Sequence, residues 1–172
     1  MKIKLVRTLS LFICISFTFF SCEVELHADS NTWYEARVTA VIDGDTIQVQ
    51  FTGEDCPSGC QWNERVRLVG VDTPELFTDP PEYYAAEARA YTNLIYRRDV
   101  LLVFDSISAK KDRYGRVLAY IYKSFDSPSI NEQLILNGYG YYYDLFSFDP
   151  EKMNDFQNAE DYARLNRVGL WR

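Results

Sequence analysis

Alternating apolar and polar positions mark the first part of the chain as strand rather than helix. The runs WYEARVTAVI (33–42) and TIQVQF (46–51) alternate in this way, and Asp43-Gly44 between them is typical of a tight hairpin turn. RVRLVGV (65–71) continues the pattern, and VLLVF (100–104) and VLAYIY (117–122) are apolar runs of strand length. The pattern therefore predicts five strands.

Helical signals follow the third strand and fill the end of the chain. Residues 82–98 repeat apolar side chains four apart, in the pairs Ala90/Leu94 and Tyr91/Ile95. Ser129 with Glu132 has capping-box spacing, in a helix that Gly138 would end, and Asp149-Pro150 opens a helix predicted to stop near Gly169. We expect a mainly β fold with α elements: a five-stranded OB-type barrel packed by about three helices.

The first 21 residues differ from the rest. Positive residues precede LSLFICISFTFF (9–20), an apolar run of signal-peptide length that is too short to span a bilayer. Ser21-Cys22 after this run resembles the lipobox of bacterial lipoproteins, in which the cysteine is acylated. Phe19 stands where a leucine is usual, so an ordinary signal peptide cut near Cys22 is the alternative. We expect a signal peptide (1–21), a tether (22–33) and one domain (34–172), exported and lipid-anchored, otherwise secreted or periplasmic.

Removal of the signal peptide would make an acidic protein more acidic. The whole chain has 18 Lys and Arg against 25 Asp and Glu; without Lys2, Lys4 and Arg7 the balance becomes 15 against 25, a net charge of −10. Such a surface repels polyanions at long range. A nucleic-acid site would therefore have to be local.

Two of the four cysteines remain once Cys14 and Cys22 are assigned to the signal segment. Cys56 and Cys60 lie in GEDCPSGCQW (53–62), a turn-rich insert between two strands. Because export favours oxidation, we expect a small loop disulfide between them. Zinc is set aside because the single histidine, His27, lies in the tether and two further ligands would be needed.

Charged residues collect at strand ends. Arg67 lies within VRLVGV (66–71), which is otherwise apolar, and two carboxylates, Asp72 and Glu75, follow within eight residues of it. Buried charge is costly unless it is paired or bound to a ligand. Asp43 and Asp45 flank the first hairpin tip, and Arg116 precedes the fifth strand. These positions favour a site at the rim of the barrel.

Six segments together resemble the staphylococcal nuclease, or thermonuclease, family over residues 34–172. They are DGDT (43–46), RLVGVDTPE (67–75), AAEARAYT (85–92), DRYGRVLAYIY (112–122), INEQLILNGYG (130–140) and the closing GLW (169–171). The resemblance implies a calcium-dependent nuclease that cleaves phosphodiester bonds in DNA and RNA, single strands preferred, and leaves 3′-phosphates. It also implies calcium ligation by Asp45, Asp72 and the carbonyl of Thr73, catalysis by Arg67, Glu75 and Arg116, and a monomer. Asp43 is left as a turn or supporting residue.

Substrate contacts implied by the resemblance are less regular. Arg113 and Tyr114 match positions near a terminal phosphate, and Tyr142 and Phe146 lie in the aromatic run YGYYYDLF (139–146) where the family stacks bases. Asp144 and Phe146 occupy the positions of two family tyrosines, so stacking would be altered or supplied by Tyr141, Tyr142 or Tyr143. Packing in the barrel mouth explains the same run equally well.

Two functional classes are therefore open. The first is the exported nuclease. The second is a catalytically silent OB-fold module that binds single-stranded nucleic acid or a protein partner. The second would be favoured by loss of a catalytic residue or a metal carboxylate, and all of them are present.

Overall fold

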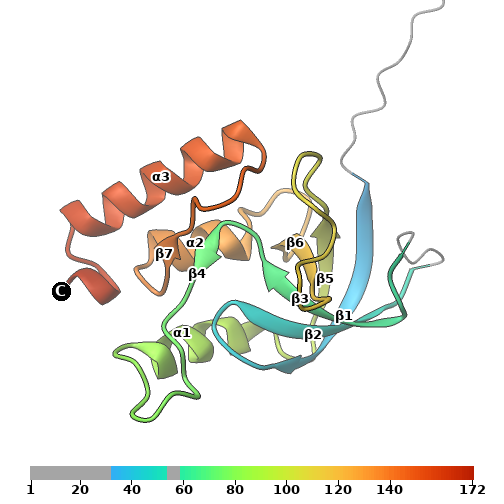
Figure 1. Ribbon diagram of the computed structural model, residues 1–172, viewed down its shortest axis with the longest axis horizontal. Coiled ribbons are helices and arrows are strands. Elements are labelled where there is room, and N and C mark those ends of the chain that lie inside the picture. Colours follow the sequence, from blue (N-terminus) through green and yellow to red (C-terminus); the bar gives the residue numbers. More distant parts are fainter. Residues whose placement is uncertain (1–31, 54–58) are drawn as a thin grey trace, which may run out of the picture.

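The computed structural model describes residues 32–53 and 59–172, and in it five strands close into a barrel in the order β1-β2-β3-β6-β5 (Figure 1). The strands are β1 (Trp33–Val41), β2 (Thr46–Phe51), β3 (Asn63–Leu68), β5 (Asp99–Val103) and β6 (Val117–Tyr122). Neighbouring strands are antiparallel except β3 and β6, which are parallel. The predicted five-stranded barrel is confirmed.

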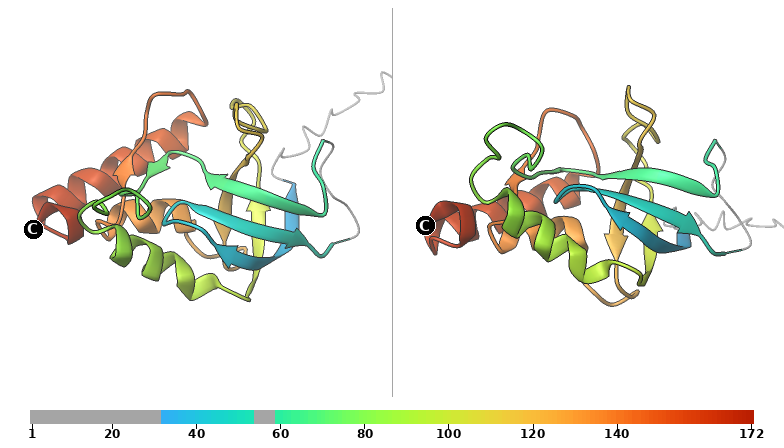
Figure 2. Two further views of the ribbon diagram at one scale, coloured as in Figure 1. Left: turned by 60° about the horizontal axis from the view of Figure 1, so that its bottom comes forward. Right: turned by 90° about the horizontal axis from the view of Figure 1, so that it is seen from below.

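Three α-helices pack on this barrel, as predicted. They are α1 (Ala85–Thr92), α2 (Ile130–Leu136) and α3 (Pro150–Leu165), with single 3-10 turns η1 (Asn93–Ile95) and η2 (Gly169–Trp171). The C terminus lies on the helical side of the molecule, away from the start of β1 (Figure 1, Figure 2). No helix in the described part of the chain has the length and apolar character needed to cross a membrane.

The predicted starts of the last two helices are confirmed. Ser129 Oγ accepts a hydrogen bond from the Glu132 N–H at 3.1 Å, and Asp149 Oδ1 accepts from the N–H groups of Glu151 and Lys152. The predicted end of the third helix near Gly169 is wrong. The helix ends at Leu165, and Arg167 then adopts a left-handed conformation (φ 52°) that helical backbone does not allow.

The first helix is shorter than the sequence predicted. It begins at Ala85 because Tyr84 before it has a left-handed φ of 71°. Its buried face consists of Ala85, Ala88 and Thr92, continued by Ile95 in η1, whereas Leu94 of the predicted stripe is 64% exposed. Small residues on this face allow the helix to approach the barrel closely.

The predicted third strand is broken at Gly70. This glycine has a φ of 72°, and a Cβ atom there would lie 2.6 Å from Phe148 Cζ and 2.8 Å from the Phe156 ring. After the break, β4 (Val71–Asp72) leaves the barrel and pairs with β7 (Tyr141–Tyr142) in a separate two-stranded sheet. The segment that carries the predicted site therefore lies outside the barrel wall.

A buried asparagine joins α2 to the barrel at the same place. Asn131 is fully buried; its Oδ1 accepts from the Ile121 N–H, and its Nδ2 donates to the carbonyls of Val69 and Ala119. These bonds satisfy the backbone where β3 ends. The orientation of the segment after Gly70 is thereby fixed from both sides.

Several sequence predictions fall on residues that the structure does not describe. The signal peptide, Cys22 and most of the tether lie before residue 32, and Cys56 lies in the 54–58 gap. Cys60 lies just after that gap and is partly buried against the core. The lipid anchor and the Cys56–Cys60 disulfide therefore stay predictions.

Candidate active site

The tip between β1 and β2 is held firmly in place. It spans residues 42–45 instead of the tight two-residue turn that Asp43-Gly44 predicted. Arg89 of α1 donates to the carbonyls of Val41 and Ile42. Gly44 is required by close contact, because a Cβ there would lie 2.6 Å from Thr73 Oγ1. The tip is thus pressed against the segment that follows β4.

Asp45 makes most of the contacts between the β1-β2 tip and the segment that follows β4. Its side chain is 6% exposed, and its Oδ2 accepts hydrogen bonds from the N–H and the hydroxyl of Thr73 at 2.8 and 3.0 Å. Its Oδ1 accepts from the Thr46 hydroxyl at 2.9 Å. Arg67 Nη1 lies 3.1 Å from Asp45 Oδ2. The fold therefore brings Asp45 together with Arg67 and Thr73, which are far from it in sequence.

Arg67 also binds the second predicted carboxylate. Its Nη2 donates to Asp72 Oδ1 at 2.6 Å, and its Nη1 donates to the Val71 carbonyl. The Arg67 side chain is 13% exposed, so its charge is paired where water has little access. The partner that a guanidinium in this strand requires is thus a pair of carboxylates, one on each side.

Two further carboxylates stand close to Asp72. Burial and then the Asp45 and Glu82 carboxylates raise the pKa of Asp72, although Arg67 acts in the opposite direction. Burial, and then Asp43, Asp45 and Asp72, raise the pKa of Glu75. Five acidic side chains therefore influence one another here, and among the described residues only Asp45 and Asp72 of these five are ion-paired, both with Arg67. The negative charge thus exceeds what Arg67 offsets.

Glu75 has its backbone fixed by an acid that the sequence did not identify. Glu82 Oε2 accepts from the Glu75 N–H at 2.9 Å, and the Glu82 N–H donates to the Glu75 carbonyl at 3.0 Å. The reciprocal pair closes the loop between the two residues. Asp43 Oδ1 accepts from the Gly44 N–H, and the Asp43 carboxylate is one of the charges that raise the pKa of Glu75. No motif in the sequence signals the role of Glu82.

The donor set fits calcium, the ion implied by the resemblance. Carboxylate and carbonyl oxygens are the ligands of this hard cation, and the excess negative charge around Asp72 is what a cation would offset. Over residues 32–53 and 59–172, no group of three or more His, Cys, Asp or Glu side chains is arranged to hold a metal. The predicted set has only two such side chains, Asp45 and Asp72, with the Thr73 carbonyl, so it falls below that number.

Arg116 stands on the loop that enters β6, beside β3. Arg67 is paired with Leu118, two residues along from Arg116. Arg116 Nε donates to Asp112 Oδ2 at 2.7 Å, and its guanidinium carbon lies 5.4 Å from the Tyr114 ring centroid. Burial would raise the pKa of Asp112, but hydrogen bonds from Arg116 and from backbone N–H groups outweigh it and lower the pKa. Asp112 therefore holds Arg116 as an ionised partner.

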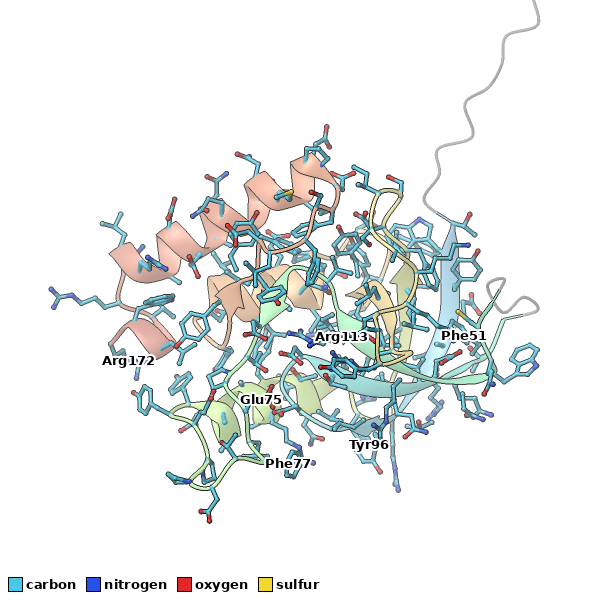
Figure 3. The ribbon with its side chains drawn as sticks, in the orientation of Figure 1. Phe51, Glu75, Phe77, Tyr96, Arg113 and Arg172 are labelled. Atoms are coloured by element: carbon cyan, nitrogen blue, oxygen red, sulfur yellow. The ribbon has the colours of Figure 1, made fainter. Side chains whose placement is uncertain are left out.

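The predicted phosphate contacts Arg113 and Tyr114 lie on the same loop and are exposed. Arg113 Nη2 donates to the Tyr114 hydroxyl at 2.7 Å, and its guanidinium lies over that ring at 4.8 Å. Tyr114 is 69% exposed. Figure 3 shows Arg113 on this loop and Glu75 on the segment after β4. The side chains of Arg113 and Tyr114 are therefore accessible to a ligand from solvent.

The aromatic run divides between packing and exposure. Tyr142 packs edge-on against Phe148 at 6.3 Å, and its N–H donates to Glu160 Oε1, so it is a partly buried packing residue. Phe146 is 69% exposed, 6.0 Å from the Tyr143 ring. Tyr141 is paired with Asp72 across the β4-β7 sheet. Of the two predicted stacking residues, only Phe146 presents its ring to solvent.

Arg89 and Gly140 also support the site without having been singled out. Arg89 is partly buried and follows Ala88 on α1, and an arginine beside the buried face of a short helix could have indicated a polar partner on the barrel. A Cβ on Gly140 would lie 2.8 Å from Val71 Cγ2 and 3.0 Å from the Asp72 carbonyl. Both residues set the position of the site carboxylates.

Fold and site thus define the class of protein: a small OB-type barrel with carboxylates and arginines at its rim. The family model described as staphylococcal nuclease homologue matches residues 65–172. This chain belongs to that family. The predicted family assignment is therefore confirmed.

Two of three similar proteins carry nuclease names. The chain is 36% identical over 164 residues to an uncharacterised protein of Methanocaldococcus jannaschii, covering 83% of this chain and 74% of that one. It is 36% identical over 105 residues to the thermonuclease of Staphylococcus hyicus, covering 59% and 55%. It is 30% identical over 146 residues to endonuclease YhcR of Bacillus subtilis, covering 80% of this chain and 11% of that protein.

Proposed function

We propose that this protein is a calcium-dependent nuclease that hydrolyses phosphodiester bonds in DNA and RNA, favours single strands and leaves 3′-phosphates. One observation carries the proposal: Arg67 is ion-paired with Asp45 and Asp72, while a second arginine, Arg116, lies two residues before Leu118, the residue that pairs with Arg67 on the neighbouring strand. A family composed of nuclease homologues, with relatives named endonuclease and thermonuclease, supports the reaction class.

Asp45, Asp72 and the Thr73 carbonyl would hold the calcium ion. When bound, the ion supplies a Lewis acid that polarises a phosphate oxygen and offsets charge. Asp45 and Asp72 are both ion-paired with Arg67 in the structure. When these carboxylates turn to a cation, the donors of Arg67 become available to a phosphate. The same three side chains therefore link metal binding to substrate binding.

The two arginines bind the charge that develops on the phosphate oxygens. A guanidinium donates parallel hydrogen bonds from a planar fork and stays protonated at any relevant pH. Arg67 approaches from β3 and Arg116 from the loop before β6, where Asp112 fixes the Nε edge. The remaining edge of Arg116 is the one that would face the leaving oxygen.

Glu75 would accept a proton from the attacking water or orient that water. Burial and neighbouring acids raise its pKa, which makes its carboxylate a better proton acceptor than an ordinary glutamate. The backbone bond to Glu82 keeps it in place. Arg113 and Tyr114 would bind a terminal phosphate, and exposed Phe146 would stack on a base.

Export and anchoring are part of the proposal. The signal-like segment before Cys22 supports an exported protein held on a membrane by a lipid on Cys22. In this location the protein would meet nucleic acid outside the cytoplasm. We propose that it acts there as a monomer.

A catalytically silent module that binds single strands or a protein is the competing function. The deciding measurement is the initial rate of single-stranded DNA cleavage, with calcium and with excess chelator, followed by analysis of the new ends. We expect cleavage only with calcium, restored when calcium is added back, and 3′-phosphate ends. Full activity in excess chelator would contradict calcium dependence, and absence of cleavage with any metal would favour the binding module.

A further inference from the structure

Arg65 is a cation without a partner inside the described part of the protein. It lies on β3, is exposed, and makes no hydrogen bond or ion pair to any residue in 32–53 or 59–172. The two predicted catalytic arginines, in contrast, are ion-paired: Arg67 with Asp45 and Asp72, and Arg116 with Asp112. An arginine that is held on a strand and unpaired is available to bind an anion.

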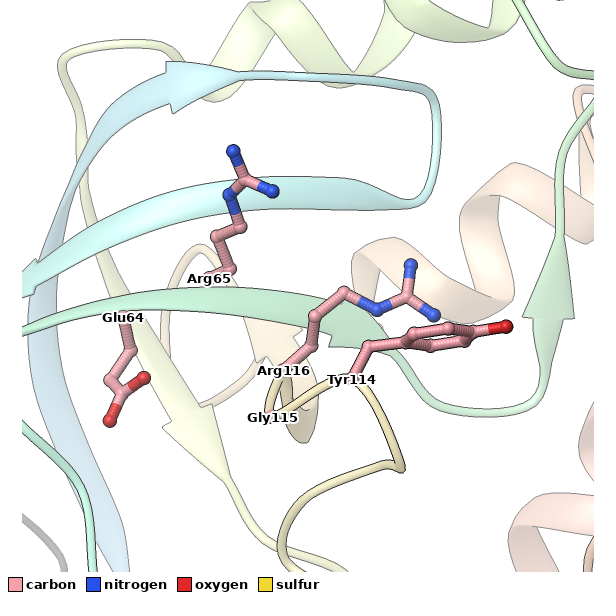
Figure 4. A pocket seen from close by; sticks show the side chains of 5 residues that line it. All are labelled: Glu64, Arg65, Tyr114, Gly115 and Arg116. Carbon is pink, nitrogen blue, oxygen red and sulfur yellow. The ribbon is translucent and has the colours of Figure 1, made fainter.

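Arg65 borders an open hollow beside the candidate active site. The hollow has a volume of about 550 Å³ and is lined by Glu64, Arg65, Tyr114, Gly115 and Arg116. In Figure 4 the Arg116 side chain extends beside the Tyr114 ring, and the Glu64 carboxyl group points the opposite way from the Arg65 guanidinium. Two cationic groups and an aromatic ring therefore border the same space.

The acid in this lining does not neutralise Arg65. Glu64 is 7% exposed, and its Oε1 accepts from Lys111 Nζ and from the Gln61 N–H, both at 2.7 Å. Its charge is thus used on the other face of β3. Asp112 is bound to Arg116. The positive charge of Arg65 remains uncompensated within the hollow.

The position of Arg65 relates it to the predicted catalytic arginines. Arg65 and Arg67 are two residues apart on one strand, so their side chains leave the same face about 7 Å apart. Arg116 directly precedes the residue that pairs with Val66, which puts it beside Arg65 across the parallel pair β3-β6. A row of cations at such spacing fits successive phosphates of one extended strand.

We propose that Arg65 binds the phosphate adjacent to the scissile one and so positions a strand of more than one phosphate across the active site. The inference rests on the proposed nuclease function and adds a substrate requirement to it. On a protein with a net charge of −7, such a local contact offsets the repulsion of a polyanion. Arg65 is a positioning residue here, because the reacting phosphate is bound by other groups.

The test compares Arg65→Gln with Arg37→Gln. Arg37 also lies on an exposed barrel strand, where it pairs with Asp99, so both variants lose one positive charge. Each is assayed on a single-stranded oligonucleotide and on a dinucleoside monophosphate, which has only one phosphate. The preference for the oligonucleotide is the ratio of the two kcat/KM values. We expect Arg65→Gln to reduce this ratio about tenfold, through a higher KM for the oligonucleotide. Arg37→Gln should leave the ratio within about twofold of the wild-type value.

A binding measurement separates this inference from the hydrolysis that it rests on. In a Glu75→Gln background, anisotropy of a labelled single strand is followed over a range of salt concentrations in the presence of calcium. Replacing Arg65 should weaken binding about tenfold and reduce the slope of log K against log salt by about 0.7, the value for one phosphate contact on a single strand. Arg37→Gln in that background should change neither.

The outcomes are distinct. Equal losses on both substrates would assign Arg65 a structural role and overturn the proposal, as would an Arg65 variant that behaves like the Arg37 control in rate and slope. If the wild-type protein cleaves nothing while binding still depends on Arg65, the nuclease function fails and the phosphate contact stands. Thermal melting of each variant confirms that it is folded.

Discussion

At the residue scale, single contacts decide which charges are available for chemistry. Arg116 is held by Asp112 through Nε, whereas Arg67 is shared between two carboxylates and Arg65 has no partner in the described chain. Three arginines on β3 and on the loop before β6 therefore differ in how their charge is paired. Mutation of each arginine should consequently give a different kinetic signature.

Replacing Arg116 should remove turnover without removing calcium. Arg116→Ala loses a charge-assisted contact to the transition state, for which we expect a cost of about 3 kcal/mol or more, a loss of at least about a hundredfold in kcat. Arg116→Lys should lie closer to alanine than to wild type, because lysine loses the planar fork and the Nε bond to Asp112. Initial rates on single-stranded DNA test this, with calcium titration of each folded variant as the control. Near-normal rates in Arg116→Ala would contradict the assigned role.

At the scale of elements, the loop between β5 and β6 is joined to α3 by one buried carboxylate. Asp105 Oδ2 accepts from the Tyr120 hydroxyl of β6 at 2.6 Å and from the Asp149 N–H at the start of α3 at 2.8 Å. Its Oδ1 accepts from the N–H groups of Ile107 and Ser108. Strand, loop and helix meet at this one side chain.

Asp105 should stabilise the fold in a pH-dependent way. Burial by itself would raise its pKa, but the bonds from Tyr120 and three backbone N–H groups outweigh burial and hold the pKa of Asp105 below its ordinary value. The stabilisation is therefore complete above the unfolded-state pKa of about 3.9 and is lost as the pH falls through the lower folded-state value. Asp105→Asn should cost about 2 to 3 kcal/mol near neutral pH, and less in acid.

Urea unfolding at neutral and acidic pH measures that difference. Asp99→Asn is a matched control, because its side chain is 72% exposed in a surface pair with Arg37, and we expect it to change the free energy of unfolding by less than about 0.5 kcal/mol. A loss for Asp105→Asn that stayed constant down to acidic pH would show that ionisation of Asp105 does not stabilise the fold.

At the scale of the whole molecule, the net charge opposes binding of the proposed substrate, whereas the proposed location outside the cytoplasm favours it. The chain has a net charge of −7, so the cations at the site act against a repulsive background. Association with nucleic acid should therefore depend on the local row of arginines rather than on the surface as a whole. A membrane anchor would keep such a site among extracytoplasmic substrates.

The mature chain should begin at an acylated Cys22. The apolar run that ends at Ser21-Cys22 is the reason for this expectation. Intact mass of protein taken from membranes should include the lipid and lack residues 1–21, whereas Cys22→Ala should lose the lipid and leave the membrane fraction. A wild-type protein found free in the medium, with an N terminus beyond Cys22, would instead indicate an ordinary signal peptide.

Sequence by itself determined the barrel, the helix caps and the identity of most charged groups at the site. Two signals are local, because backbone geometry within a few residues sets them. They are the alternation of apolar and polar residues in the strands, and the capping residues Ser129 and Asp149 at helix starts. Family motifs then supplied roles for Asp45, Arg67 and Glu75. Local rules were wrong where packing intervened, as at Gly70 and at Tyr84.

Only the tertiary structure decided which charges meet. Gly44 reads locally as a turn residue, yet its space is taken by Thr73, twenty-nine positions away in the chain. Glu82 fixes the backbone of Glu75, and Arg65 lies beside Arg116 with no partner in the described residues, because strand pairing and loop closure set these distances. Pairing and desolvation of charge depend on three-dimensional neighbours, so the sequence names the groups but the fold determines which of them remain available to bind.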